Sequence, residues 1–309
     1  ETLVQLGLNA HDFCLKLQAG ETFTSPAIIC GYSNSGFETM SHNLHNFAKD
    51  FILRAGLRPV LYNSWEATEF GVTCEEQKKL AKRAQELGAE LFVVDDGWFG
   101  ERNDDYRGLG DWYPNTNKLP SGISGLSKKV NDLGLNFGLW IEPEMVNKDS
   151  ELYRNHPDWI ISTPNRSDSH GRNQYVLDFS RHEVVDYIHE MISKVLRESN
   201  ISYIKWDMNR SITECYSKAF PKEQQGEVMH RYILGVYDLY ERLINEFPKI
   251  LFESCSSGGG RFDPGMLYYA PQAWASDDSD AIERLKIQYG TSMVYPISSI
   301  GAHVSEIVN

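Results

Sequence analysis

The chain has 309 residues and a formal net charge of −13, from 30 lysines and arginines against 43 aspartates and glutamates. Apolar residues make up 41% of the sequence and aromatic residues 12%, which is typical of a folded protein and excludes a disordered chain. The acidic balance argues against nucleic acid and against an anionic membrane surface as partners, because both bind basic surfaces.

Length, cysteine content and the N-terminal residues bound the organisation and the compartment. A chain of this length corresponds to one large domain or two smaller ones. No run reaches the roughly 18 uncharged apolar residues of a membrane span, and the first residues lack the basic start and apolar run of a signal peptide. The five cysteines are widely spaced and form no Cys-x-x-Cys pair. We therefore predict a cytoplasmic protein with neither a disulfide framework nor a zinc site.

The first 35 residues alternate apolar and polar side chains, as in Asp12–Gln18 and Ala27–Tyr32. This period of two, broken by glycine and serine, predicts antiparallel strands. Residues 36–54 change to a helical period, with Met40, Leu44 and Phe47 on one face.

From Arg58 onward, short apolar runs alternate with longer amphipathic segments. We count eight runs, at residues 60–63, 91–94, 137–141, 175–177, 201–204, 250–252, 272–275 and 293–297. Capping boxes at Thr73 with Glu76 and at Ser180 with Glu183 predict two helix starts, and residues 228–247 form a further helical pattern. Eight strand–helix units within about 250 residues predict a parallel sheet closed into a (β/α)8 TIM barrel. Dinucleotide binding has no support, because no GxGxxG follows the first run.

Active sites of such barrels lie at the C-terminal ends of the strands, and the residues that follow the runs share one chemistry. They are mostly carboxylates and indoles with a few cations: Trp65, Asp95, Asp96, Trp140, Glu142, Glu144, Asp178, Lys205, Asp207, Asn209, Arg210, Glu253, Cys255, Asp277, Asp278, Asp280 and His303. A sugar needs such a site, with hydrogen-bond partners for its hydroxyls, aromatic faces for its C–H surface and two carboxyl groups for bond cleavage.

Two aspartates suit the two catalytic roles. Asp207 lies between Lys205 and Arg210, whose positive charges favour the ionised carboxylate of a nucleophile. Asp277 lies beside Asp278, where repulsion between like charges favours a retained proton, as a general acid requires.

Other interpretations of these residues, taken singly, stay open. An aspartate at a strand end is often a helix cap, which applies to Asp278 and Asp280. Asp95 and Asp96 could hold a divalent metal. Structural roles are the alternative for three more features: Cys255, the loop at 258–260, and His303.

Five blocks, in order, resemble the α-galactosidases of glycoside hydrolase family 36. They are VVDDGWFG at 93–100, GLWIEPEM at 138–145, KWDMNR at 205–210, ESCSSGGGRFD at 253–263 and WASDDSD at 274–280. The resemblance runs from about Gly20 to His303. It implies a retaining hydrolase in which Asp207 is the nucleophile and Asp277 is the acid/base, with Asp278 as the neighbouring alternative.

The resemblance also implies a galactose pocket without metal or cofactor. The family's pocket maps onto ten residues: Trp65, Asp95, Asp96, Trp140, Arg172, Lys205, Asn209, Cys255, Gly258 and Trp274. Asp95 and Asp96 would bind the 4- and 6-hydroxyls, and Lys205 and Arg172 the 3-hydroxyl side. Cys255 and the glycine-rich backbone would lie near the 2-hydroxyl and leave little room for an N-acetyl group.

The same resemblance predicts the domain organisation. Residues 1–35 would be the remnant of an N-terminal β-sandwich domain, residues 36–56 a linking helix, and residues 57–309 a catalytic barrel that lacks its final helix. We expect this chain to be a piece of a longer protein that forms a homo-oligomer, a tetramer by the resemblance.

The leading hypothesis is thus a retaining α-galactosidase that hydrolyses α-1,6-galactosides such as melibiose, raffinose and stachyose. Retention predicts a separation of about 5–5.5 Å between the carboxyl groups of Asp207 and Asp277. The alternative within the family is a raffinose-synthase-like α-galactosyltransferase. Two other classes remain: a catalytically silent sugar-binding barrel, against which Asp207 and Asp277 argue, and a metal-dependent hydrolase that uses Asp95 and Asp96.

Overall fold

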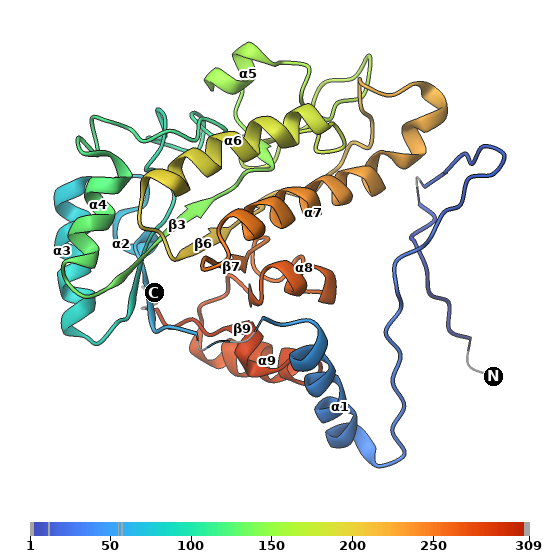
Figure 1. Cartoon of the computed structure of the whole chain (residues 1–309), viewed down its shortest axis with the longest axis horizontal. Coiled ribbons are helices and arrows are strands. Elements are labelled where there is room, and N and C mark those ends of the chain that lie inside the picture. The colour runs from blue at the N-terminus through green and yellow to red at the C-terminus, as the bar shows by residue number, and fades with distance from the viewer. Residues whose placement is uncertain (1–2, 12, 55, 57, 306–309) are drawn as a thin grey trace.

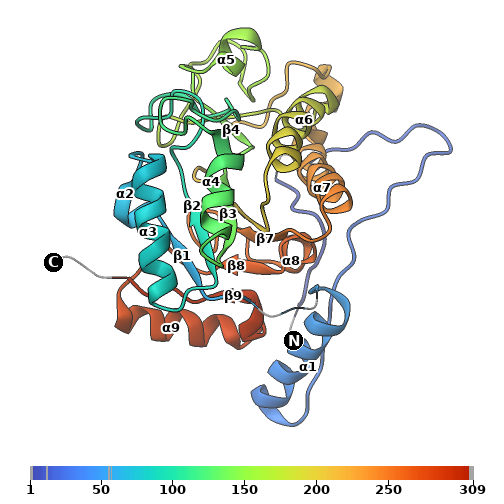
Figure 2. The ribbon, with the colours of Figure 1, turned by 60° about the vertical axis from the view of Figure 1, so that its left-hand side comes forward.

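The computed structural model describes residues 3–11, 13–54, 56 and 58–305. In this part of the chain the centre is a seven-stranded parallel sheet, which curls into a half-barrel with helices on its outer face (Figures 1 and 2). The strands, in their order across the sheet, are β1 (Leu61–Asn63), β2 (Leu91–Val94), β3 (Asn136–Ile141), β6 (Tyr203–Trp206), β7 (Leu251–Ser254), β8 (Gln272–Trp274) and β9 (Ile300–Gly301).

The helices come mostly between successive strands. They are α1 (Gly36–Phe51), α2 (Trp65–Thr68), α3 (Cys74–Glu86), α4 (Gly122–Asn131), α5 (Glu151–Asn155), α6 (His182–Glu198), α7 (Val228–Glu246), α8 (Pro264–Tyr269) and α9 (Ala281–Ser292), with 3-10 turns η1 (Lys222–Glu227) and η2 (Ile297–Ser299). Among the described residues, no helix is both long enough and apolar enough to cross a membrane.

The predicted eighth-strand closure is wrong, because two of the eight runs do not join the parallel sheet. Residues 175–177 contribute β5 (Tyr175–Val176), which pairs antiparallel with β4 (Met145–Val146), so β3 pairs directly with β6. The backbone N–H of Leu177 donates instead to Glu144 and that of Asp178 to Trp159. No ladder joins β1 to β9 within the described residues, so a half-barrel stands where a complete (β/α)8 barrel was predicted.

The second misplaced run is at residues 293–297. The N–H groups of Met293, Val294 and Tyr295 donate to carbonyls in the last turn of α9, so this stretch prolongs the helix. Pro296 follows and has no N–H for a strand ladder. The last strand begins only at Ile300.

Side chains along the strands alternate between two environments. One set packs against the helices in the main core: Phe92, Val94, Phe137, Leu139, Ile204 and Phe252. The other set forms a small apolar cluster inside the curl: Leu61, Leu91, Val93, Tyr203 and Leu251. Because side chains two residues apart share a face, the inner row continues toward the strand ends with polar residues. The inner face is therefore apolar at its base and polar at its C-terminal edge.

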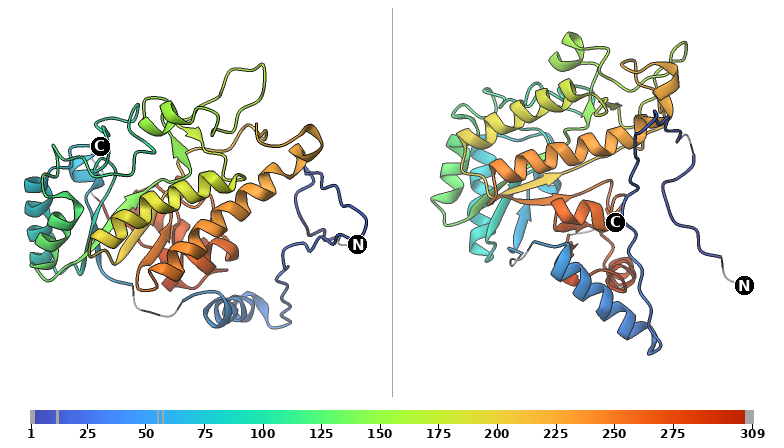
Figure 3. Two further views of the ribbon diagram at one scale, coloured as in Figure 1. Left: turned by 45° about the horizontal axis from the view of Figure 1, so that its top comes forward. Right: turned by 45° about the vertical axis from the view of Figure 1, so that its right-hand side comes forward.

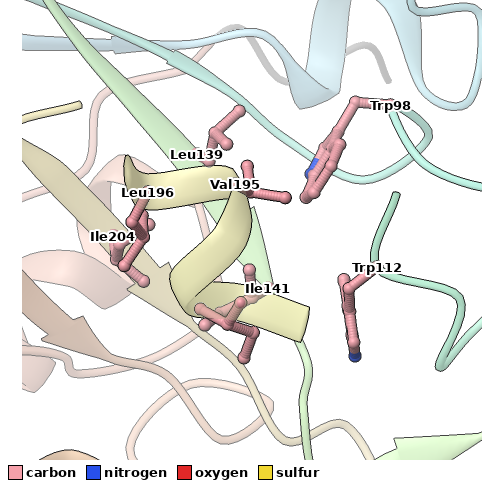
Figure 4. A pocket seen from close by; sticks show the side chains of 8 residues that line it. Trp98, Trp112, Leu139, Ile141, Val195, Leu196 and Ile204 are labelled. Carbon is pink, nitrogen blue, oxygen red and sulfur yellow. The ribbon is translucent and has the colours of Figure 1, made fainter. Parts of the chain in front are cut away.

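A small cavity of about 10 Å³ lies in the main core between β3, β6 and α6 (Figure 4). Only apolar and aromatic side chains line it: Trp98, Trp112, Leu139, Ile141, Ile192, Val195, Leu196 and Ile204. A site of this size holds one water at most, and its lining does not suit a polar ligand. It is packing space on the outer side of the sheet and is separate from the polar inner face.

Two helix starts were predicted from capping boxes, and one of them is confirmed. Thr73 is the N-cap of α3, where its hydroxyl accepts a hydrogen bond from the N–H of Glu76 at 3.4 Å. The other is wrong, since α6 has Arg181 as its N-cap. Ser180 is buried, and its hydroxyl donates to the carboxylate of Asp178 instead of capping the helix.

We expect Thr73→Ala to lower the free energy of unfolding by about 1 kcal/mol, because the N–H of Glu76 loses its acceptor. Urea unfolding followed by circular dichroism measures the effect. Thr73→Ser keeps the hydroxyl and serves as the matched control. If the alanine variant is as stable as the wild-type protein, the Thr73 cap does not contribute to the free energy of unfolding.

The N-terminal segment extends away from the body of the molecule (Figure 3). No strand forms at residues 3–11 or 13–35, although antiparallel strands were predicted there. A strand needs a neighbouring backbone for its N–H and C=O groups. Among the described residues, one backbone bond joins this segment to the rest of the chain, from the N–H of Cys14 to the carbonyl of Gly226 at 3.0 Å. Phe13 and Phe23 lie edge-on to His230 on α7.

The predicted domain limits stay predictions. The helix expected at 36–56 is present as α1, whose Ser41 and His45 bind the carbonyls of Met293 and Ser292 beside α9. Parts of the predicted units, at residues 1–2, 12, 55, 57 and 306–309, lie outside the described residues.

Candidate active site

The strand register brings the predicted site residues together on the inner face. Trp140 on β3 is opposite Lys205 on β6, and Lys205 is opposite Glu253 on β7. Asp207 and Cys255 come two residues after Lys205 and Glu253, so they continue the same inward row just beyond the strand ends.

Asp207 is a buried carboxylate with only 5% of its surface exposed. The indole N–H of Trp140 donates to its Oδ2 at 3.1 Å, and the N–H of Met208 donates to its Oδ1 at 2.9 Å. Burial alone would raise the pKa of Asp207, but the charge of Lys205 and hydrogen bonds that include one from the Cys255 thiol lower it overall. The carboxylate is therefore ionised at neutral pH, as a nucleophile must be.

Lys205 joins Asp207 to the first strands of the sheet. Its Nζ lies 3.0 Å from Oδ2 of Asp95, and the side-chain amide of Asn63 donates to the same oxygen at 2.6 Å. Burial alone would lower the pKa of Lys205, yet the charges of Asp95, Cys255 and Asp207 raise it. Asp95 is thus held in a buried ion pair at the floor of the site.

Asp96 is held in a second buried ion pair, with Arg102. The guanidinium Nη2 donates to Oδ2 at 2.8 Å and Nε donates to Oδ1 at 2.9 Å. Burial raises the pKa of Asp96, and the charge of Arg102 opposes that rise. With a cation already on each of Asp95 and Asp96, the pair is poorly suited to a divalent metal. In the described chain no group of three or more His, Cys, Asp or Glu side chains is placed to hold a metal.

Glu142 is a buried site residue to which the sequence assigned no role. It is 0% exposed, directly after β3, and accepts hydrogen bonds from the N–H of Asn209 and from Nε2 of Gln174 at 2.7 Å. Burial and the negative charge of Asp207 raise the pKa of Glu142 to about 8. The amide oxygen of Gln174, Oε1, is buried without a hydrogen-bond partner among the described residues. A flipped Gln174 would accept the proton of a neutral Glu142.

We expect the free energy of unfolding to fall as pH rises from about 5 to about 8, in part because Glu142 loses its proton. A pKa raised from 4.5 to about 8 gives stability that is fully present below the unfolded pKa and is lost as pH rises through the folded pKa. Glu142→Gln is neutral at every pH, so its fall should be smaller. Urea unfolding at both pH values measures this, and an equal fall in the two proteins would contradict the raised pKa.

Asp277 lies at the open side of the site, beyond β8. The indole N–H of Trp274 donates to its Oδ1 at 2.9 Å, and the ring of Trp274 lies 5.9 Å from Nζ of Lys205. Asp278 instead accepts the N–H of Asp280 at 2.9 Å, and Asp280 is the N-cap of α9. The helix-cap interpretation is thus confirmed for Asp280, whereas Asp278 holds the turn before α9. Asp277 is the aspartate bound by the indole of Trp274.

Gly258 brings the glycine-rich loop against the backbone of Asp277. Its φ is +86°, and a Cβ added there would lie 2.7 Å from Cα of Ser276 and 2.9 Å from N of Asp277. A side chain at this position would be strained and would clash with backbone, so glycine is required.

The remaining predicted residues lie toward the rim. Trp65 begins α2 and packs edge-on against Phe70, and its N–H donates to the Asn63 side chain that also binds Asp95. Arg172 is exposed, with a φ of +51°, and within the described chain has no hydrogen-bond or ion-pair partner. The side-chain carbonyl of Asn209 accepts a hydrogen bond from Ser257 at 3.3 Å. The structure therefore joins eight of the ten pocket residues by contacts, while Trp65 joins through Asn63 and Arg172 stands apart.

Carboxylates oriented by indoles and cations, at the C-terminal edge of a curled parallel sheet, are typical of barrel-type glycoside hydrolases. The model of the Melibiase family matches residues 22–309, and the chain belongs to that family. The resemblance to family 36 α-galactosidases is confirmed by the relatives that follow.

Similarity to known proteins was found in sequence and in structure. α-Galactosidase AgaA of Geobacillus stearothermophilus is 56% identical over 99% of this chain and 42% of its own length. Its crystal structure superposes with a TM-score of 0.95, over 97% of this chain and 42% of that one. The bifunctional α-galactosidase/sucrose kinase AgaSK of Mediterraneibacter gnavus is 49% identical over all of this chain and 33% of its own length. The chain thus spans less than half the length of the curated relatives it matches.

Proposed function

We propose that the protein containing this chain is a retaining α-galactosidase that removes terminal α-galactosyl residues from α-1,6-galactosides. The observation that carries the proposal is the buried Asp207 carboxylate, kept ionised by Lys205 and oriented by Trp140. Support for the substrate class comes from AgaA, whose solved structures include complexes with raffinose and with stachyose.

The proposed reaction proceeds in two displacements. Asp207 attacks the anomeric carbon while Asp277 protonates the departing glycosidic oxygen, which leaves a β-galactosyl ester on Asp207. Asp277 then takes a proton from water, the water attacks the same carbon, and galactose leaves with its α configuration retained. The predicted separation of about 5–5.5 Å between the two carboxyl groups belongs to this mechanism.

Two further observations support the pair Asp207 and Asp277. Asp278 is committed to the turn before α9, whereas Asp277 binds the indole of Trp274. The raffinose and stachyose complexes of AgaA are of variants that each carry a substitution at a different aspartate, and those two aspartates are 70 positions apart. Asp207 and Asp277 have the same spacing.

Specificity for galactose is proposed to rest on the two buried ion pairs. Asp95 and Asp96 would accept the 4- and 6-hydroxyls, with Lys205 and Arg172 at the 3-hydroxyl and Cys255 with Gly258 near the 2-hydroxyl. A substrate lacking the axial 4-hydroxyl would leave these buried carboxylates one hydrogen bond short, which is a strong basis for rejection. We propose that neither metal nor cofactor takes part, since Lys205 and Arg102 already occupy the carboxylates.

The test is turnover of p-nitrophenyl α-galactopyranoside by the full-length protein, with the β-galactoside and the α-glucoside as controls. We expect turnover of the α-galactoside alone, and proton NMR of a fresh reaction should show α-galactose as the first product. Release of β-galactose first would overturn retention. Transfer to added sucrose in preference to water would identify a galactosyltransferase instead.

Location and assembly are also proposals. None of the cysteines in the described chain forms a disulfide, which supports a cytoplasmic protein. The tetramer expected from the family resemblance is tested by light scattering of the full-length protein.

A further inference from the structure

Glu144 is a buried carboxylate that the proposed mechanism does not use. It is 0% exposed and lies between β3 and β4. Its Oε1 accepts the indole N–H of Trp206 at 2.9 Å, and its Oε2 accepts the hydroxyl of Tyr232 at 2.5 Å. Nη1 of Arg261 donates to Oε2 at 3.0 Å, and Nη2 lies 2.9 Å from Oε1. The carboxylate is therefore the hub of three segments that are distant in sequence.

The first of these contacts connects Glu144 to the nucleophile. Trp206 immediately precedes Asp207, and its indole stacks on Tyr240 with ring centres 3.9 Å apart. The hydrogen bond to Glu144 binds the indole N–H, which is the only polar group of that ring. Because one face of the ring is stacked and its N–H is bound, the Trp206 side chain is fixed. The backbone of the next residue, Asp207, is fixed with it.

A second contact, the ion pair with Arg261, connects Glu144 to the acid/base. Arg261 ends the glycine loop, residues 255–261, which also contacts both catalytic segments. At its start, the N–H of Cys255 donates to the carbonyl of Trp206 at 2.8 Å. In its middle, Gly258 and Gly259 lie against residues 275–277, where added Cβ atoms would approach backbone atoms to 2.9 Å or less. The loop therefore lies between the segments that carry Asp207 and Asp277. Its last residue, Arg261, is held by the ion pair with Glu144.

We propose that the Glu144–Arg261 ion pair is a positioning device that sets the placement of Asp277 relative to Asp207. Neither residue touches the sugar in this proposal, which rests on the proposed function of the site. When the ion pair between Arg261 and Glu144 is lost, the glycine loop shifts and Asp277 moves with it. Asp207 stays in place, because Trp206 is still held by its stacking on Tyr240. The loss should therefore fall on proton donation to the leaving group.

The test compares two aryl α-galactosides in the full-length protein. Loss of 2,4-dinitrophenolate needs no protonation, whereas loss of 4-methoxyphenolate does. We expect Arg261→Lys to lower kcat/KM at least about tenfold more on the methoxyphenyl substrate than on the dinitrophenyl substrate. Glu144→Gln keeps the side-chain volume and an oxygen that can accept the Trp206 N–H, but it loses the charge that pairs with Arg261, so it should show the same bias.

Two matched variants complete the design. Tyr232→Phe removes one donor from Glu144 but leaves Arg261 and Trp206 bound, and Glu227→Gln removes a buried carboxylate from its Arg231 pair at η1 and α7. Both should keep the wild-type ratio between the substrates. The ratio does not depend on how much of a variant is folded, so it is informative even for an unstable one.

Equal losses on the two substrates in Arg261→Lys and Glu144→Gln would overturn the proposal and leave the ion pair a purely structural one. The bias appearing equally in Tyr232→Phe would also overturn it. Absence of turnover of either galactoside by the wild-type protein is a different result, because it would reject the proposed function itself.

Discussion

Asp207→Asn is expected to lower kcat/KM on p-nitrophenyl α-galactopyranoside by roughly 10⁴-fold or more, the scale seen when a catalytic nucleophile is lost. An amide is a poor nucleophile, and asparagine removes the charge that Lys205 supports. Its side-chain oxygen still accepts a hydrogen bond from Trp140 or Met208, so the fold and the binding of galactose should survive. Asp238→Asn on α7, outside the site, is the matched control and should keep full activity.

Chemical rescue sharpens this prediction. Asp207→Gly opens space beside the anomeric carbon, and added azide can then attack from the side that the carboxylate occupied. The expected product is β-galactosyl azide, identified by NMR. Activity of Asp207→Asn close to that of the wild-type protein would remove this residue from the mechanism.

Asp277→Asn is expected to lose activity in proportion to how much the leaving group needs a proton. We expect roughly a 10²–10⁴-fold loss on melibiose and a much smaller loss of the first step on the dinitrophenyl galactoside. Asparagine can still accept the Trp274 N–H but has no acidic proton to give. Steady-state kinetics on a series of aryl galactosides measures the dependence.

Asp278→Asn is the matched control for this prediction, since it changes the neighbouring residue with the same chemistry. Its side-chain oxygen can still accept the N–H of Asp280, so most activity should remain on every substrate. If Asp278→Asn showed the leaving-group dependence and Asp277→Asn did not, the two aspartates would exchange roles.

The central sheet and most of the site follow from short-range pattern. Apolar runs mark β1, β2, β3, β6, β7 and β8, and the period of two places the residues after each run on the inner face. Asp207 and Cys255 could be predicted for this reason, because each continues a row that begins with buried residues of its own strand. The family resemblance added the roles, which pattern alone does not supply.

Residues in the long connections could not be predicted in the same way. Arg102 reaches Asp96 from a loop, and Gln174 reaches Glu142 from the segment before β5. These pairings depend on how the loops fold back over the strand ends, and no periodicity encodes that. The run at 175–177 leaves the parallel sheet for a related reason, since it pairs antiparallel with β4 and the N–H of Leu177 donates to Glu144.

Covalent trapping is the measurement that tests Asp207 as the nucleophile most directly. A 5-fluorinated α-galactosyl fluoride carries a good leaving group, while its ring fluorine slows breakdown of the galactosyl ester. After brief reaction, the intact mass of the full-length protein should rise by one fluorogalactosyl group, and peptide mapping should place that group on Asp207. A label on any other residue, or turnover with β-galactose as the first product, would contradict the two-step mechanism proposed for this site.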